Sequence, residues 1–193
     1  MRSLLLCSRP PWPPSGGDRL RTAALARALA ELGEVAVVAT RQPDEDPAGP
    51  PAGLPEVARW WLPPLDRSGA VLRTLRALPG REPLQQAIYR APAALAATAE
   101  ALEAFRPDFV VAHLLRTESW LPRERPPLLL DIQDALSHQY AQSQGATGWR
   151  RLAFAVERRR VEDAEAGAAQ RADLLGFISE RDRVAAGGPP DRS

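Results

Sequence analysis

The first 40 residues contain a buried strand, a loop rich in glycine and proline, a helix and a second buried strand. Leu4–Leu6 is a continuous apolar run, typical of a strand buried on both faces of a parallel sheet. Apolar residues then recur at helical spacing from Asp18 to Leu32, and Gly33 ends the helix ahead of a second apolar run, Val35–Ala39. Parallel strands joined by a helix form a right-handed crossover, so this segment predicts a parallel sheet.

The rest of the chain continues this alternation. The predicted helix places five residues at helical spacing: Leu20, Ala23, Ala24, Ala28 and Leu32. Further strands are expected at 57–62, 109–112, 128–132 and 174–178, and helices at 71–78, 92–105, 149–171 and from residue 179 or 180. The predicted fold class is α/β, a doubly wound, Rossmann-like parallel sheet, which binds ligands at the carboxyl ends of its strands.

Composition removes several classes of protein. The 193 residues carry 25 basic and 24 acidic side chains, a net charge of +1, so nucleic acid is not an expected partner. Cys7 is the single cysteine, which excludes an internal disulfide and makes the cytoplasm the default compartment. The apolar run at the start is too short for a membrane span or a signal peptide.

The loop after the first strand is the first candidate binding site. Gly16 and Gly17 allow a ligand to approach the backbone, and the N-terminus of the following helix favours an anion such as a diphosphate. The alternative is a plain turn in which Asp18 caps the helix. The loop matches neither the Gly-x-Gly-x-x-Gly dinucleotide motif nor a P-loop, because the chain has no lysine.

Two later loops follow predicted strands. His113 comes directly after the strand at 109–112, where an imidazole can donate to a substrate oxygen or act as acid or base; the alternative is a structural histidine. Asp131 and Asp134 end the next strand, where two carboxylates can bind sugar hydroxyls, a metal or a proton. Alternatively, Asp131 ties the sheet edge and Asp134 caps a helix through Ser137.

Two charged segments favour simpler interpretations. Asp44-Glu45-Asp46 lies in a proline-rich loop and is interpreted as solvated, so no metal site is predicted. The run from Glu157 to Glu165 alternates in charge along a helix, which is typical of a solvated face with i,i+4 pairs. With Arg150 and Arg151, it is also a candidate for peripheral contact with anionic lipid at the inner face of a membrane.

The order of these loops resembles a known enzyme family. The segments that carry the resemblance are RPPWPPSGGDRLR (9–21), GEVAVVAT (33–40), RPDFVVAH (106–113), LLLDIQDALSHQY (128–140) and ADLLGFISERD (172–182). Together they resemble the N-terminal domain of retaining GT-B glycosyltransferases (family 4, group 1), and are most similar to exopolysaccharide-type sugar transferases. The resemblance covers residues 1–183, with 184–193 as the start of a linker.

The resemblance implies a domain that binds the acceptor and contacts the diphosphate of a nucleotide-sugar donor. The residues matched to the phosphate loop are Gly16 and Gly17, with Asp18 and Arg19 beside them; His113 and Asp134 match the catalytic loops. Relatives with His-Asp at the last position differ from this chain, which has Gln133-Asp134. A departing nucleoside diphosphate can be stabilised by backbone N–H groups and arginines without a metal or other cofactor.

The resemblance also implies a C-terminal donor domain, which this sequence does not contain. We therefore expect residues 1–193 alone to bind nucleotide sugar poorly and to turn over negligibly, and to need the missing domain or a partner subunit. The acceptor is expected to be a sugar or a lipid-linked sugar in cell-surface polysaccharide synthesis. The alternatives are a non-catalytic α/β binding module and a partner-dependent subunit of a split transferase.

Overall fold

The computed structural model describes residues 1–42, 53–133 and 149–177. Its strands are β1 (Arg2–Cys7), β2 (Glu34–Ala39), β3 (Val57–Trp61), β4 (Phe109–His113), β5 (Leu128–Gln133) and β6 (Leu174–Phe177). Its helices are α1 (Gly17–Leu32), α2 (Arg67–Ala77), α3 (Leu84–Tyr89), α4 (Pro92–Phe105), α5 (Leu115–Glu118) and α7 (Trp149–Arg171). The predicted helix after residue 178 and the predicted linker lie outside the described residues.

All six strands join one parallel sheet in the order β3-β2-β1-β4-β5-β6. The chain builds outward from β1 to β3 and then returns to the other side of β1 with β4. This order is that of the doubly wound Rossmann fold, so the predicted α/β fold class is confirmed. The order reverses between β1 and β4, which makes their carboxyl ends the expected ligand crevice.

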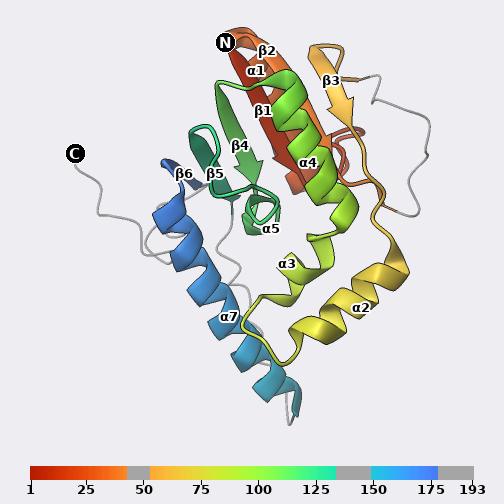
Figure 1. The fold of residues 1–193 in the computed structure, drawn as a ribbon, viewed down its shortest axis with the longest axis vertical. Helices are drawn as coiled ribbons and strands as arrows, with labels where there is room; N and C mark the ends of the chain where they lie inside the picture. Colours follow the sequence, from red (N-terminus) through yellow and green to blue (C-terminus); the bar gives the residue numbers. More distant parts are fainter. Residues whose placement is uncertain (43–52, 134–148, 178–193) are drawn as a thin grey trace.

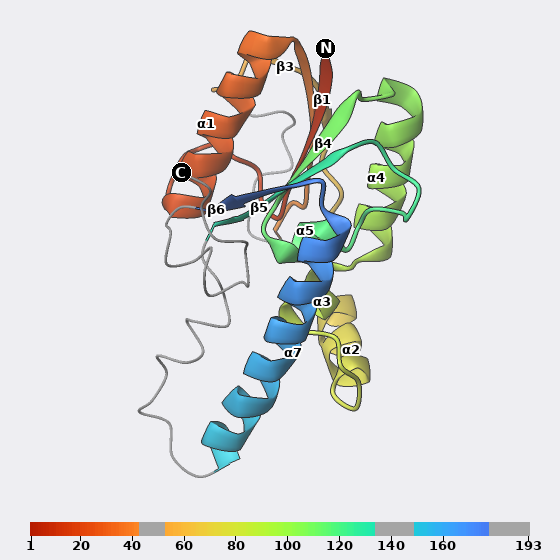
Figure 2. The same cartoon turned by 90° about the vertical axis from the view of Figure 1, so that its left-hand side faces the viewer.

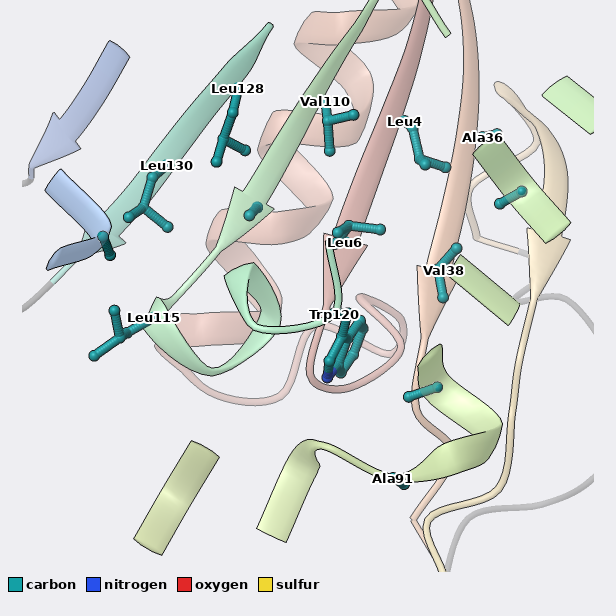
Figure 3. Packing of buried hydrophobic residues seen from close by; sticks show 14 of the residues in the cluster. Leu4, Leu6, Ala36, Val38, Ala91, Val110, Leu115, Trp120, Leu128 and Leu130 are labelled. Carbon is teal, nitrogen blue, oxygen red and sulfur yellow. The ribbon is translucent and has the colours of Figure 1, made fainter. Parts of the chain in front are cut away.

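Helices cover both faces of the sheet, with α1 on one side and α4 on the other (Figure 2). Alternate residues of each strand therefore enter different cores. Leu4 and Leu6 of β1 face the α4 side, where they pack with Val110 and Leu128 (Figure 3). Leu5 and Cys7 face the α1 side. The strands are buried on both faces, as their unbroken apolar runs predicted.

The predicted face of α1 is wrong in detail. Ala23 is buried, but Leu20 and Leu32 are 60% and 59% exposed. The helix instead buries Thr22, Ala26 and Leu29 against the sheet. Small side chains on this face allow the helix to approach the strands closely, and Leu20 and Leu32 then lie on the solvent side.

Helices α2, α3 and the first half of α7 extend beyond the carboxyl edge of the sheet (Figure 1). They contact one another through polar groups: the Leu84 N–H donates to Glu157 Oε1 at 2.7 Å, and Arg160 Nη2 donates to the Leu78 carbonyl at 2.5 Å. The sequence did not predict the short helices α3 and α5. Both lie on this side of the sheet, so they help to shape the edge where a ligand is expected.

Candidate functional site

The candidate site lies at the carboxyl edge of the sheet, between the ends of β1 and β4. The loop from β1 to α1 meets the end of β4 there, because the two strands are neighbours. A narrow crevice with about 140 Å³ of empty space is lined by Cys7, Ser8, Arg9, Asp18, Arg19, Thr22 and His113. Pockets that enclose small ligands are about 300–1,000 Å³, so a ligand would lie across the mouth of this crevice.

His113 ends β4 and is held by the neighbouring strand. It is in register with Asp131 of β5, and its Nδ1 lies 2.8 Å from Asp131 Oδ2. The two side chains are only 1% and 2% exposed. Because a carboxylate only accepts hydrogen bonds, Nδ1 carries the proton in this pair and Nε2 is the other functional nitrogen of the ring.

The Nε2 atom of His113 is buried and has no hydrogen-bond partner among the described residues. Buried polar atoms in folded proteins nearly always have a partner, so an exception calls for a ligand or water at that position. With Nδ1 fixed by a carboxylate, Nε2 of the neutral ring can accept a proton from a hydroxyl; in the charged ring it donates to an oxygen. His113 therefore has the geometry of an oriented acid, base or hydrogen-bonding group.

Asp131 is also bound by Arg21 from the first turns of α1. Arg21 Nε and Nη2 donate to the two carboxylate oxygens at 2.7 and 2.5 Å, which is bidentate geometry. Burial alone would raise the pKa of Asp131, but the hydrogen bonds from Arg21 and His113 outweigh it and hold the pKa below its usual value. Asp131 is therefore ionised at neutral pH and links α1, β4 and β5.

The glycine loop lies at the N-terminus of α1, as predicted. Gly16 is the N-cap residue with φ 103° and ψ 161°, a conformation that favours glycine, and Gly17 is the first helical residue. Asp18 lies inside the first turn and does not cap the helix; its Oδ1 accepts from the Arg19 N–H at 2.9 Å. The first N–H groups of a helix have no intrahelical partner, so Gly17 can present its N–H to an anion.

Arg116 is a further cation at this edge, and it was not among the predicted site residues. Its guanidinium stacks on Tyr89, 4.8 Å from the ring centroid, and Nη1 donates to Gln85 Oε1 at 3.2 Å. Burial lowers the pKa of Arg116, and its charge interacts with those of Asp18 and Arg9, which places it toward the first loop. Its Nε is buried without a partner in the described part of the chain.

Backbone strain also marks this turn. Leu114, between His113 and the helix that carries Arg116, has φ 72° and ψ 148°, although it has a bulky side chain. Such conformations cost roughly 1–3 kcal/mol and cluster at functional sites. The strain directs His113 back toward the sheet edge while α5 begins. The sequence signal available for Arg116 was its position three residues after the strand-end histidine.

Five of the six predicted site residues come together at this edge. Gly16, Gly17, Asp18 and Arg19 lie on one side of the crevice and His113 on the other. Asp134 lies outside the described residues. The structure gives Asp131 the sheet-edge role considered as an alternative, with His113 and Arg21 as its partners. The functional roles assigned to these residues stay predictions.

Two searches of the described residues bear on metal and membrane. Within residues 1–42, 53–133 and 149–177, no group of three or more histidine, cysteine or acidic side chains is arranged to hold a metal ion. No helix in this part of the chain combines the length and apolarity needed to cross a bilayer. The absence of a metal requirement stays a prediction.

The fold and the site define a Rossmann-like α/β domain with a polar site at the point where the strand order reverses. No family model and no curated protein sequence matches the chain. Among solved structures, the chain is similar to sucrose-phosphate synthase from Thermosynechococcus elongatus, with a TM-score of 0.52 and 16% identity. The match covers 99% of this chain and 54% of that chain, so this chain spans about half the length of the neighbour. The similarity shows a fold shared with a GT-B glycosyltransferase.

Proposed function

We propose that this chain is the acceptor-binding half of a glycosyltransferase that uses a nucleotide-sugar donor with retention of configuration. The observation that carries the proposal is His113, oriented by Asp131, with an unpartnered Nε2 facing the same crevice as the glycine loop. The fold shared with half of sucrose-phosphate synthase supports it. The sequence resemblance favours an exopolysaccharide-type acceptor, a sugar or a lipid-linked sugar.

The proposed chemistry follows from the two sides of the crevice. As the sugar leaves the donor, negative charge grows on the diphosphate. The Gly17 N–H, the N-terminus of α1 and the side chain of Arg19 stabilise that charge. His113 Nε2 binds a sugar hydroxyl, donating to it or accepting from it. Asp18 competes for the same helix N-terminus, because its carboxylate already accepts the Arg19 N–H.

The open crevice supports a need for a second unit. Its empty space of about 140 Å³ is too small to enclose a nucleotide sugar, so the other wall must come from elsewhere. We propose that this wall is a second Rossmann-like unit, linked to this one or supplied by a partner. The 193-residue chain alone is expected to transfer sugar at a negligible rate, and robust transfer by the purified chain would contradict this part of the proposal.

A titration of the 193-residue chain with uridine diphosphate and with inorganic pyrophosphate, followed by NMR of backbone amides, tests the donor side. We expect millimolar binding with the largest shifts at Gly16, Gly17, Asp18 and Arg19. Gly17→Pro removes one N–H at the first helical position, where proline is tolerated. Loss of a hydrogen bond to a charged group corresponds to about a 10- to 100-fold weaker affinity.

Gly17→Ala is the matched control, because it keeps the N–H and its methyl group would point into open space. It is expected to bind like the unsubstituted chain. Shifts confined to other parts of the protein, or equal affinity of the proline and alanine variants, would contradict the assignment of the glycine loop as the phosphate site. In that case the chain is better described as a binding module with a different ligand.

A further inference from the structure

Helix α2 has one face fixed to the protein and the opposite face exposed. On the inner side, Ala77 is buried and Arg73 donates from Nε and Nη2 to the carbonyls of Ala87 and Ile88 at 3.2 and 3.0 Å. These contacts hold the helix against α3. The orientation of α2 is therefore determined, and its outer side chains face away from the core.

The outer face of α2 is apolar. Val71, Leu75 and Leu78 follow an i, i+4, i+7 spacing and are 61%, 56% and 51% exposed, and Leu72 beside them is 47% exposed. We call these four residues the α2 stripe. Exposed leucines elsewhere, such as Leu32 on α1, do not form such a row. A contiguous exposed apolar stripe on a soluble domain marks an interaction surface.

The stripe is bordered by positive charge. From residue 67 to residue 81 the chain has four arginines and no carboxylate. Arg76 and Arg81 are exposed beside the stripe. The nearest acidic residues are engaged elsewhere: Asp66 caps α2 by accepting the Gly69 N–H at 2.6 Å, and Glu82 pairs with Arg90 at 3.6 Å.

The charged run of α7 differs from α2 in this respect. Its arginines are matched by carboxylates on the same helix: Arg158 pairs with Glu162 at 3.0 Å, and Arg160 with Glu157 at 3.4 Å. Much of the positive charge of α7 is therefore neutralised locally. The sequence had suggested this run as the candidate for lipid contact, whereas the structure brings an apolar face and excess positive charge together on α2.

We propose that α2 docks in the plane of an anionic lipid bilayer, with the α2 stripe inserted at the level of the headgroups and the arginines beside lipid phosphates. An amphipathic helix with basic residues on its borders binds such surfaces. A second copy of the chain fits less well, because two α2 helices face to face would bring arginines together. Four side chains also bury far less than the roughly 800 Å² per partner of a stable protein interface.

Docking through α2 has a geometric consequence for the candidate site. Both α2 and the candidate site lie on the carboxyl side of the sheet (Figure 1). The proposed membrane contact would therefore bring the mouth of the crevice toward the bilayer. The proposal itself rests on the α2 stripe and the arginines, and it stands independently of sugar transfer.

Co-sedimentation of the 193-residue chain with vesicles tests the proposal. Vesicles of mixed phosphatidylglycerol and phosphatidylcholine are expected to bind the chain, and pure phosphatidylcholine vesicles to bind it much less. The double variant Leu72→Gln with Leu75→Gln is expected to lower the partition coefficient about tenfold or more. Arg76→Gln is expected to lower it about fivefold, since each basic residue near an anionic surface contributes on the order of 1 kcal/mol.

The control variants carry the same changes at equally exposed positions. Leu20→Gln with Leu32→Gln replaces two leucines on α1 that are 60% and 59% exposed, and Arg159→Gln removes a charge from α7. Both are expected to bind like the unsubstituted chain. Equal binding of the α2 variants and controls would overturn the proposal, as would failure to bind anionic vesicles. A dimer that the α2 variants dissociate would assign the stripe to a second copy and also overturn it.

Discussion

Replacing Arg21 by glutamine is expected to destabilise the protein by about 2–4 kcal/mol at neutral pH. Arg21 makes two hydrogen bonds to Asp131, which is 2% exposed, whereas the Arg21 side chain itself is 31% exposed. Removing one partner of a fully buried ion pair costs about 3–5 kcal/mol, and the exposure of Arg21 reduces this value. For a chain of this size, the loss corresponds to a fall in Tm of about 5–10 °C.

The destabilisation should depend on pH in a defined direction. The pKa of Asp131 is held below its usual value in the folded state, so the ionised carboxylate contributes stability above about pH 4, its unfolded pKa. That contribution is lost as the pH falls through the lower, folded pKa. Without Arg21, burial dominates and the folded pKa of Asp131 rises. The difference in stability between the two proteins is therefore largest near pH 7 and shrinks below pH 4.

Thermal unfolding followed by circular dichroism between pH 3 and pH 8 measures this difference. Arg158→Gln is the matched control, because it breaks an exposed i,i+4 pair with Glu162 worth about 0.3–0.5 kcal/mol. If Arg21→Gln changes Tm no more than this control, or if its effect is as large at pH 3 as at pH 7, the carboxylate is not the group that Arg21 stabilises and the reasoning fails.

Three further predictions follow from other contacts. Gly33→Ala should lower stability by about 2 kcal/mol or more in urea denaturation, because Gly33 has φ 152° and a methyl group there would overlap the Met1 carbonyl oxygen; an unchanged midpoint would refute this. Burial raises the pKa of the Cys7 thiol, so Ellman's reagent at pH 8 should label it in denaturant but not in the native protein, and rapid native labelling would contradict its burial. Glu118→Gln should cost about 1–2 kcal/mol in the same denaturation assay, because Glu118 is buried and accepts from Arg171 Nε and Nη2 at 2.8 and 3.0 Å; an unaltered stability would show that the pair contributes nothing.

The fold could be predicted because its strands are signalled locally. Leu4–Leu6, Val35–Ala39 and the later apolar runs are bounded by glycine, proline or charge, and each became a strand of the parallel sheet. The face of α1 could not be predicted, because it depends on alanine and threonine. Thr22 is buried at little cost because its hydroxyl donates to the carbonyls of Asp18 and Arg19 at 2.9 and 3.1 Å.

The candidate site was predictable to the extent that it depends on strand ends. His113 follows a strand and Asp131 lies in the next strand, so parallel register alone brings them together. The contribution of Arg21 depends on how α1 packs across the sheet, 110 residues away in sequence from Asp131, and no local pattern encodes it. Arg116 was missed for the same reason, since its stacking on Tyr89 depends on α3.

The direction of β1 determines how this protein is best immobilised. The strand begins at Arg2 on the amino edge of the sheet and ends at Cys7, which lines the candidate site. A six-residue strand spans about 20 Å, so an attachment point at the N-terminus lies a full sheet height from the crevice. A chain tethered to a sensor surface through Met1 would present both the crevice and α2 to the solution. Attachment at that end is therefore the suitable geometry for measuring nucleotide and vesicle binding on the same chip.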